Sequence, residues 1–255
     1  MAIINSPTNF RVLNWAKLKN KVYRDKQKLF MVEGFHPVQE AHKAGALQEI
    51  ICTDNEAAVA ARFVKSNLLS GNKNFDVPQH QVTYAVMEKL TSLATPTKLI
   101  GICRQPSPAP CTNSVLLIDQ IHHPGNLGTI IRSAVAFNVG TIVLNNSVDV
   151  YNQKVIQASR GLIFHINIIK SPLQGFILQL KKDGYQIIGT DVRDGIDLRQ
   201  AQAAEKRAIL LGNEGDGVGV DLLGLCDIKV NIKMNEKCES LNVGVAASII
   251  MHGLT

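Results

Sequence analysis

The sequence predicts an α/β protein with two domains, and three observations lead to that prediction. Apolar runs of strand length alternate with helix-like segments along the chain. Three prolines alternate with small residues in "RQPSPAPCTNS", residues 104–114, a pattern that blocks helix and central strand alike. The 255 residues are enough for one large domain or two smaller ones. We therefore expect domains at residues 1–105 and 114–255, joined by a linker at 106–113.

The first domain is expected to be a small α/β sandwich. Glycines punctuate its pattern: Gly34 ends the first strand and Gly45 ends the second helix. The predicted helices are residues 10–20, 37–45, 56–71 and 87–93. The predicted strands are residues 28–34, 47–53 and 98–104.

The second domain alternates more regularly. Its strand candidates are each apolar over four or more consecutive residues, as buried parallel strands are, and lie at 115–120, 141–146, 185–191, 207–214 and 227–232. The helical segments between and after them are residues 126–138, 152–160, 172–183 and 241–253. This order predicts a parallel sheet that is covered by helices on both faces.

The net charge of +6 is concentrated near the N-terminus. Residues 10–30 carry seven basic side chains and one acidic one, a local balance that equals the whole excess. Cations neutralise phosphates and aromatic rings stack on unpaired bases, so basic residues interleaved with Phe10, Trp15, Tyr23 and Phe30 favour an RNA partner. The predicted RNA contacts in this segment are Lys19, Lys21, Arg24 and Lys26. A solvated helical face is the alternative interpretation.

The five cysteines are odd in number and scattered, which predicts reduced thiols in a cytoplasmic protein rather than disulfides or a zinc site. No apolar run reaches the length of a membrane span, and the N-terminal residues do not resemble a secretion signal. The adjacent His122 and His123 have no cysteine or carboxylate at ligand spacing, so we expect no metal.

Three polar clusters follow strands of the second domain, where ligands bind in open parallel sheets. In "HHPGNLGTIIRSAVAF", residues 122–137, a helix begins near Asn126 and carries Arg132, which predicts a phosphate site. A capped helix with one surface arginine explains that segment equally well.

The second cluster is "LLGNEGDGVG", residues 210–219, where four glycines in eight residues require a close backbone approach around Glu214. The segment matches neither the dinucleotide-binding fingerprint nor the P-loop, which argues against NAD and ATP as ligands. A tight turn with a solvated glutamate is the alternative. In the third cluster, "EKCESLNVGVAASII", Ser240 or Asn242 is expected to cap the last helix. A cap explains one polar residue there, not three.

Together, "HPGNLGTIIRSAVAFNVG", "LLGNEGDGVG" and "IKMNEKCESLNVGVAASII" resemble the three motifs of the SpoU (TrmH) family of RNA ribose 2′-O-methyltransferases, within the SPOUT superfamily. The resemblance covers most of residues 114–255. The segment "LKNKVYRDKQKLFMVEGFHPVQEA" resembles the N-terminal, ribosomal-protein-like substrate-binding domain of many members. The resemblance implies a deep trefoil knot, one of the rare exceptions to the rule that protein chains are not knotted. It also implies a homodimer with each active site near the subunit boundary.

The same resemblance implies S-adenosylmethionine as cofactor, bound through backbone groups at Thr190, Gly212, Ile232 and Leu241, with Asp191 close to Thr190. It matches the active-site positions of the family to Asn126, Arg132, Glu214, Ser240 and Asn242. Guanidinium stays protonated in ordinary sites, so we expect Arg132 to clamp the adjacent phosphate and stabilise the developing alkoxide rather than to act as the base.

The chain departs from the family pattern at His123, Asn138 and Lys233, where the family usually has aspartate, glycine and proline. Asparagine tolerates the left-handed conformation, so the turn at Asn138 should survive. The expected substrate is ribosomal RNA, with transfer RNA as the second choice. A base N-methyltransferase of the same superfamily and an RNA-binding protein without activity are the alternatives, and the Ser-Leu-Asn motif at 240–242 argues against the first of these.

Overall fold

The computed structural model describes residues 3–53 and 77–254 and divides the chain into two compact units. The first unit comprises Met1–Pro106 and Tyr151–Phe164, and the second comprises Ser107–Val150 and His165–Thr255. The first unit therefore includes a segment that lies, in sequence, between two strands of the second. The helix predicted at 56–71 lies outside the described residues.

The first unit contains a four-stranded mixed sheet in the order β1-β4-β2-β3. β4 is antiparallel to both of its neighbours, and β2 pairs with β3 in parallel. The helices are α1 (Phe10–Lys17), α2 (Lys21–Gln27), α3 (Phe35–Lys43), α5 (Tyr84–Leu90) and α7 (Gln153–Ser159). The strands are β1 (Leu29–Glu33), β2 (Leu47–Thr53), β3 (Gln79–Val82) and β4 (Leu99–Arg104).

The predicted helices and strands of the described part of the first unit are confirmed, but α2 and β3 were not predicted. Both are short and polar, and their sequences KVYRDKQ and QHQV carry no clear apolar period. One core of this unit is formed by α1 and α5 on the sheet, through side chains such as Val12, Met87 and Ile100, all fully buried. α7 packs on β1, where the Gln153 amide donates to the carbonyl of Met31 (3.0 Å).

The second unit contains a seven-stranded parallel sheet in the order β7-β6-β5-β10-β8-β11-β9. The strands are β5 (Ser114–Asp119), β6 (Thr141–Asn145), β7 (Asn167–Lys170), β8 (Gln186–Thr190), β9 (Ile196–Asp197), β10 (Arg207–Leu211) and β11 (Ile228–Asn231). The helices are α6 (Pro124–Ala136), α8 (Leu173–Lys182), α9 (Val220–Leu223) and α10 (Val243–Gly253). All five predicted strands are confirmed, while the short edge strands β7 and β9 were not predicted.

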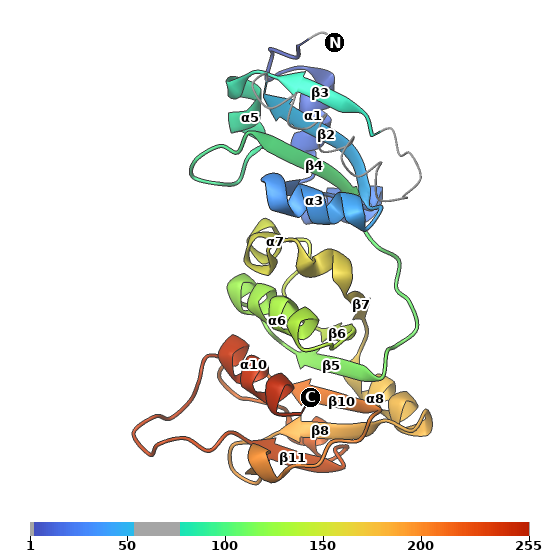
Figure 1. Ribbon diagram of the computed structural model, residues 1–255, viewed down its shortest axis with the longest axis vertical. Coiled ribbons are helices and arrows are strands. Elements are labelled where there is room, and N and C mark those ends of the chain that lie inside the picture. Colours follow the sequence, from blue (N-terminus) through green and yellow to red (C-terminus); the bar gives the residue numbers. More distant parts are fainter. Residues whose placement is uncertain (1–2, 54–76, 255) are drawn as a thin grey trace. The chain divides into compact units, whose positions relative to one another are not determined.

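Helices cover both faces of this sheet, as predicted. Leu173, Ile177 and Leu180 of α8 pack on one face, against side chains such as Leu117 and Leu210. α6 and α10 lie on the opposite side of the sheet and pack against each other (Figure 1). Because every strand runs in the same direction, the carboxyl ends of β5, β10, β8 and β11 lie in a row at one edge.

The turn after α6 follows the prediction for Asn138, which adopts a left-handed conformation with φ of 57°. Val139 then donates its N–H to the carbonyl of Ala134 (2.8 Å) and closes the helix end. The trefoil knot that the resemblance implies stays a prediction. No helix within the described residues is long and apolar enough to cross a membrane.

Candidate active site

The three polar clusters of the sequence meet at the carboxyl edge of the parallel sheet. The first cluster begins α6 after β5, the second follows β10, and the third precedes α10. β5 and β10 are direct neighbours in the sheet, with Ile118 paired with Leu211, which places the loops after them side by side. Segments separated by about 90 residues in the chain are thereby brought together at one edge.

A chain of hydrogen bonds links one residue from each cluster. The Asn126 amide nitrogen donates to Oε1 of Glu214 at 2.6 Å. The Asn126 amide oxygen accepts from Nδ2 of Asn242 at 3.0 Å. Asn126 is therefore the centre of the site, because its two amide atoms hold the other two side chains at once.

Asn242 also caps the last helix. Its Oδ1 accepts from the backbone N–H groups of Gly244 (2.9 Å) and Val245 (3.4 Å), two of the donors that a helix start leaves without partners. With Oδ1 accepting these bonds, Nδ2 is the group that faces Asn126, so the cap sets the orientation of the amide. Ser240 does not cap this helix.

The turn that carries Glu214 is built by Asn213, a residue that the sequence analysis did not single out. Its Oδ1 accepts from the N–H groups of Gly215 and Asp216, both at 2.7 Å. Asparagine followed by small and acidic residues is a typical signature of such a turn, so the signal was present in the sequence. Asn213 thereby presents Glu214 to Asn126.

Arg132 and Ser240 are exposed, and neither side chain has a hydrogen bond or ion pair with the described residues. The structure does not bring them into contact with the Asn126–Glu214–Asn242 chain. The backbone carbonyl of Ser240 accepts from the Cys238 thiol at 3.4 Å. Both side chains are thus left open to a ligand, and their catalytic roles remain predictions.

The four residues expected to hold a cofactor follow the same edge. Thr190 is the last residue of β8, Gly212 directly follows β10, and Ile232 directly follows β11. β8 pairs with both β10 and β11, so these three positions lie next to each other. Leu241 directly precedes the cap residue Asn242, which is bonded to Asn126.

This cradle fits the proposed cofactor by its chemistry. Ile232 and Leu241 are half-buried apolar side chains, suited to the faces of an adenine ring. The Thr190 hydroxyl donates to the carbonyl of Leu210 (3.0 Å) and ties β8 to β10. The sequence indicated that glycine at 212 allows a close backbone approach, and the structure shows what approaches it. A Cβ there would lie 2.0 Å from the backbone of Gly217, so the close approach is to its own turn.

The loop after β11 is fixed from the side of β9. Asn231 donates its amide to the carbonyl of Gly195 and pairs with Asp197 in the ladder. Hydrogen bonds from Arg199 lower the pKa of Asp197 to about 2, with a smaller contribution from the charge of Lys233. Lys233, where the family usually has proline, is exposed, and its charge lies close enough to act on Asp197.

The basic stripe of the first unit is partly used for structure. Arg24 is buried, and its guanidinium donates to the carbonyls of Leu18 (2.9 Å) and Lys19 (2.8 Å). It holds the turn between α1 and α2, so its prediction as an RNA contact is corrected. Lys19 donates to the carbonyls of Lys89 and Thr91, both at 2.8 Å, which ties this turn to the end of α5.

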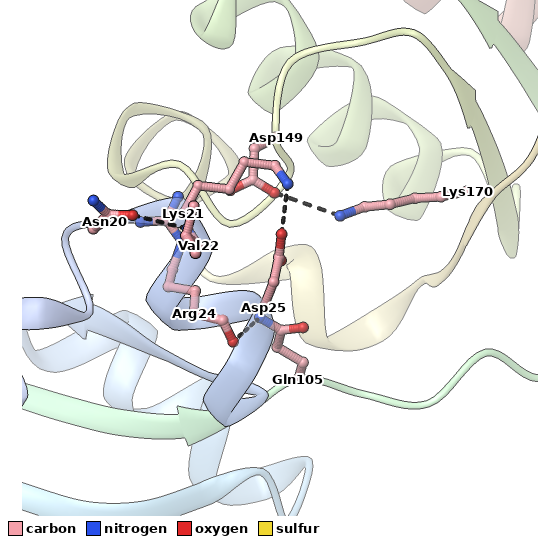
Figure 2. A network of polar contacts seen from close by, with 8 residues as sticks. All are labelled: Asn20, Lys21, Val22, Arg24, Asp25, Gln105, Asp149 and Lys170. Carbon is pink, nitrogen blue, oxygen red and sulfur yellow. Dashed lines mark hydrogen bonds and ion pairs between the residues drawn. The ribbon is translucent and has the colours of Figure 1, made fainter.

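Other members of the stripe remain accessible. Lys21 pairs with Asp25 at 2.5 Å (Figure 2), and its side chain is 57% exposed, so a phosphate still has access to its ammonium. Lys26 is exposed and has no ion pair with a described residue. Of the four aromatic residues in the prediction, Trp15 and Phe30 are buried, whereas Phe10 is exposed and Tyr23 is half-buried, so base stacking stays a prediction for these last two.

Comparisons with known proteins identify relatives along the whole chain. The model of the SpoU rRNA Methylase family matches residues 113–252, and the model of the MRM3-like substrate binding domain matches residues 9–101. The 23S rRNA (guanosine(2553)-2'-O)-methyltransferase RlmP of Bacillus subtilis is 33% identical over 257 residues, which cover 100% of this chain and 99% of that protein.

Two solved structures share the architecture. An AdoMet-bound rRNA methyltransferase from Sinorhizobium meliloti has a TM-score of 0.85 and 25% identity, over 99% of this chain and 96% of that chain. The SpoU methyltransferase AviRb from Streptomyces viridochromogenes, in complex with AdoMet, has a TM-score of 0.81 and 24% identity, over 96% of each chain, and shows the fold.

Proposed function

The chain belongs to the SpoU rRNA methylase family, and from this premise we propose that it transfers a methyl group from S-adenosylmethionine to a ribose 2′-hydroxyl of ribosomal RNA. The observation that carries the proposal is the hydrogen-bonded chain of Asn126, Glu214 and Asn242, which joins the three motifs at the carboxyl edge of the sheet. The named activity of the full-length relative makes 23S rRNA the first substrate to test.

The cofactor, when bound, supplies a sulfonium methyl that is already electrophilic. The chain has to hold the cofactor, orient the ribose and remove a proton from its 2′-hydroxyl. In our proposal, backbone groups at Thr190, Gly212, Ile232 and Leu241 hold the cofactor. Arg132 remains protonated, clamps the adjacent phosphate and stabilises the developing alkoxide.

The amide groups in the site retain donors for the ribose. An amide nitrogen has two hydrogens, and Nδ2 of Asn242 gives one of them to Asn126. The second hydrogen is available to a ribose oxygen, and the exposed Ser240 hydroxyl is a further candidate to fix the ribose. Glu214 accepts through Oε1, which leaves Oε2 to orient a neighbouring group or to accept from the substrate.

The proposal extends to the assembly. The first unit would select structured RNA, with the exposed Lys21 and Lys26 among its cations. The chain would act as a homodimer in the cytoplasm, with each active site near the subunit boundary. Two apolar side chains of α10 support the dimer, because Val245 is 46% exposed and Ile249 is 40% exposed although they share one helix face.

The test is transfer of labelled methyl from S-adenosylmethionine to ribosomal RNA, followed by mapping of ribose methylation in cells with and without the gene. We expect one methylated ribose in 23S rRNA to depend on the chain, and the position that corresponds to guanosine 2553 is the first to inspect. Label on a base would support a base methyltransferase. Label on transfer RNA alone would make transfer RNA the substrate instead of ribosomal RNA. Cofactor binding without any methyl transfer would indicate an RNA-binding protein.

The proposed role of Arg132 is tested with a separate variant. Arg132→Lys keeps the charge and removes the planar fork that matches a phosphate. We expect turnover to fall by about tenfold or more while cofactor affinity is retained. Near-full turnover would show that the fork is not needed. Lys154→Arg in α7 is a matched control, since it exchanges the same two cations on an exposed helix position of the first unit.

A further inference from the structure

Two helices that begin in the first and third motifs, α6 and α10, contact each other in regularly spaced pairs. Asn126 bonds to Asn242, and Thr129 lies against Gly244. Ser133 bonds to Ser248, and the ring of Phe137 meets that of His252 edge-on with centroids 5.3 Å apart. The residue numbers rise together along both helices, so the helices run in the same direction and meet nearly every turn.

The approach is closest beside the active site. A Cβ at Gly244 would lie 3.2 Å from Cγ2 of Thr129, tighter than ordinary van der Waals contact. Only glycine lets the first turn of α10 come this close to α6 without displacing Thr129. One turn further along, the hydroxyl groups of Ser133 and Ser248 are 2.7 Å apart.

The direction of the hydrogen bond between the two hydroxyls follows from a second contact. The Ser248 hydroxyl donates its only hydrogen to the carbonyl of Gly244 at 2.7 Å. Its oxygen must therefore accept from Ser133, which makes Ser133 the donor between the helices. Both serines are half-buried, and their hydrogen bond is a second directional polar contact between the two helices, about two turns along from the bond between Asn126 and Asn242.

The position of this contact matters for the site. Ser133 directly follows Arg132, and Ser248 bonds to Gly244, whose N–H is held by Asn242. The serine pair thus connects the backbone that carries Arg132 with the helix start that carries Asn242. A rotation or slide of one helix against the other would change the distance between these two groups. The hydrogen bond adds a contact of fixed direction to the close packing of the two helices.

We propose that Ser133 and Ser248 are positioning residues, whose hydroxyl pair locks α6 and α10 in the register that sets Arg132 against Ser240 and Asn242. This inference rests on the proposed function and deepens it. In this proposal the two hydroxyls bond to each other and to Gly244 rather than to the substrate. Their effect reaches the reaction through the placement of Arg132 and of the ribose-binding groups.

The test compares Ser133→Ala, Ser248→Ala, the double variant and Ser248→Thr, which keeps a hydroxyl. A displacement of about 1 Å in a reacting group costs up to about a hundredfold in rate, so we expect each alanine variant to lower kcat by about tenfold. The kcat of the double variant should be no lower than that of the less active single variant, because either substitution already removes the hydrogen bond between the two serines. KM for RNA and the Kd for S-adenosylmethionine should stay within about twofold, and Ser248→Thr should recover most of kcat.

Ser159→Ala is the matched control. Ser159 is also a helix serine that donates to a carbonyl of its own helix, that of Ile156 at 3.0 Å, but it lies in the other unit. It should leave kcat unchanged. Parental kcat in Ser248→Ala, or losses that multiply in the double variant, would overturn the proposal.

Amide hydrogen exchange provides a readout that needs no activity. The N–H groups of Gly244 and Val245 should exchange faster in both alanine variants than in the parent and in Ser159→Ala. If the parent transfers no methyl to RNA, the proposed function fails, and exchange alone decides the inference. Unchanged exchange at these two amides would overturn it even in an active enzyme.

Discussion

Replacing Asn126 by aspartate tests the centre of the site with a change of almost no volume. In the parent, the Asn126 amide donates to Glu214 at 2.6 Å and accepts from Asn242 at 3.0 Å. An aspartate still accepts from Asn242 but has no hydrogen to give to Glu214. Asn126→Asp therefore turns one hydrogen bond into a contact between two carboxylates and leaves the other bond in place.

The expected cost follows from charge and distance. Two unit charges about 4 Å apart repel by about 1 kcal/mol in water-like surroundings and by about 4 kcal/mol at an effective dielectric constant of about 20. Glu214 is exposed, so we take the lower part of this range, about 1–2 kcal/mol, and add about 1 kcal/mol for the lost hydrogen bond. The total of about 2–3 kcal/mol corresponds to a fall in Tm of roughly 4–12 °C for a chain of this size. Asn126→Ala loses both bonds without adding charge, at about 0.5–1 kcal/mol each in this exposed site, and should cost about 1–2 kcal/mol.

The assay is urea unfolding and thermal melting of the parent, Asn126→Asp, Asn126→Ala and the double variant Asn126→Asp with Glu214→Gln. In the double variant the glutamine amide donates to the new carboxylate, so the hydrogen bond returns with its direction reversed. We expect it to regain most of the stability.

The reasoning is refuted if Asn126→Asp is no less stable than Asn126→Ala at pH 7. It is also refuted if adding Glu214→Gln leaves the aspartate variant unimproved, because repulsion by Glu214 would then not be the cause. Methyl transfer by the same proteins is informative in a separate way. A stable double variant with no turnover would assign Glu214 a role beyond its contact with Asn126.

Three further predictions concern other parts of the second unit. Gly212→Ala places a Cβ 2.0 Å from facing backbone and should destabilise the protein by about 1–3 kcal/mol or more. In the control Gly175→Ala, in α8, the new Cβ meets open space, so this variant should be neutral or stabilised by up to about 1 kcal/mol. Equal melting temperatures of the two variants would contradict this prediction. Burial raises the pKa of Cys226 to about 11, so iodoacetamide at pH 8 should label the exposed Cys238 before Cys226. S-adenosylmethionine should slow the labelling of Cys238, and peptide mass mapping measures both effects. The carboxyl carbon of Asp197 should titrate in NMR near pH 2 rather than 3.8. The stability that Asp197 contributes is therefore present above about pH 4 and is lost as pH falls through about 2. A midpoint at 3.8 would mean that Arg199 does not pair with Asp197 in solution.

Much of the second unit was predictable from local pattern. Runs such as "VLLI" are buried on both sides, and few other structures accommodate four consecutive apolar residues between polar ones. The family resemblance was also visible, because its motifs are local stretches of sequence. The short strands β7 and β9 were missed because an edge strand needs less apolar surface, and its pairing depends on a neighbour that is distant in the chain.

In the first unit, local pattern identified the basic stripe but did not predict which charges would remain open. Arg24 and Lys26 are two residues apart and look alike in the sequence. Successive positions on a helix point in different directions, so Arg24 turns inward to the carbonyls of Leu18 and Lys19 while Lys26 faces solvent. Trp15 and Phe30 were expected to stack on RNA bases because they interleave with the cations, but both are buried in the protein.

The sequence by itself determined the alternation of strands and helices, the motif residues and a polar cap at Ser240 or Asn242 on the last helix, because each depends on neighbours within a few positions. Only the tertiary structure decided that Asn126 joins Glu214 to Asn242, that Ser133 meets Ser248, and that Tyr151–Phe164 belongs to the first unit. These contacts connect residues about 90 to 120 positions apart or more. They arise from the order of parallel strands in a sheet and the packing of helices on it, which no local stretch of sequence encodes.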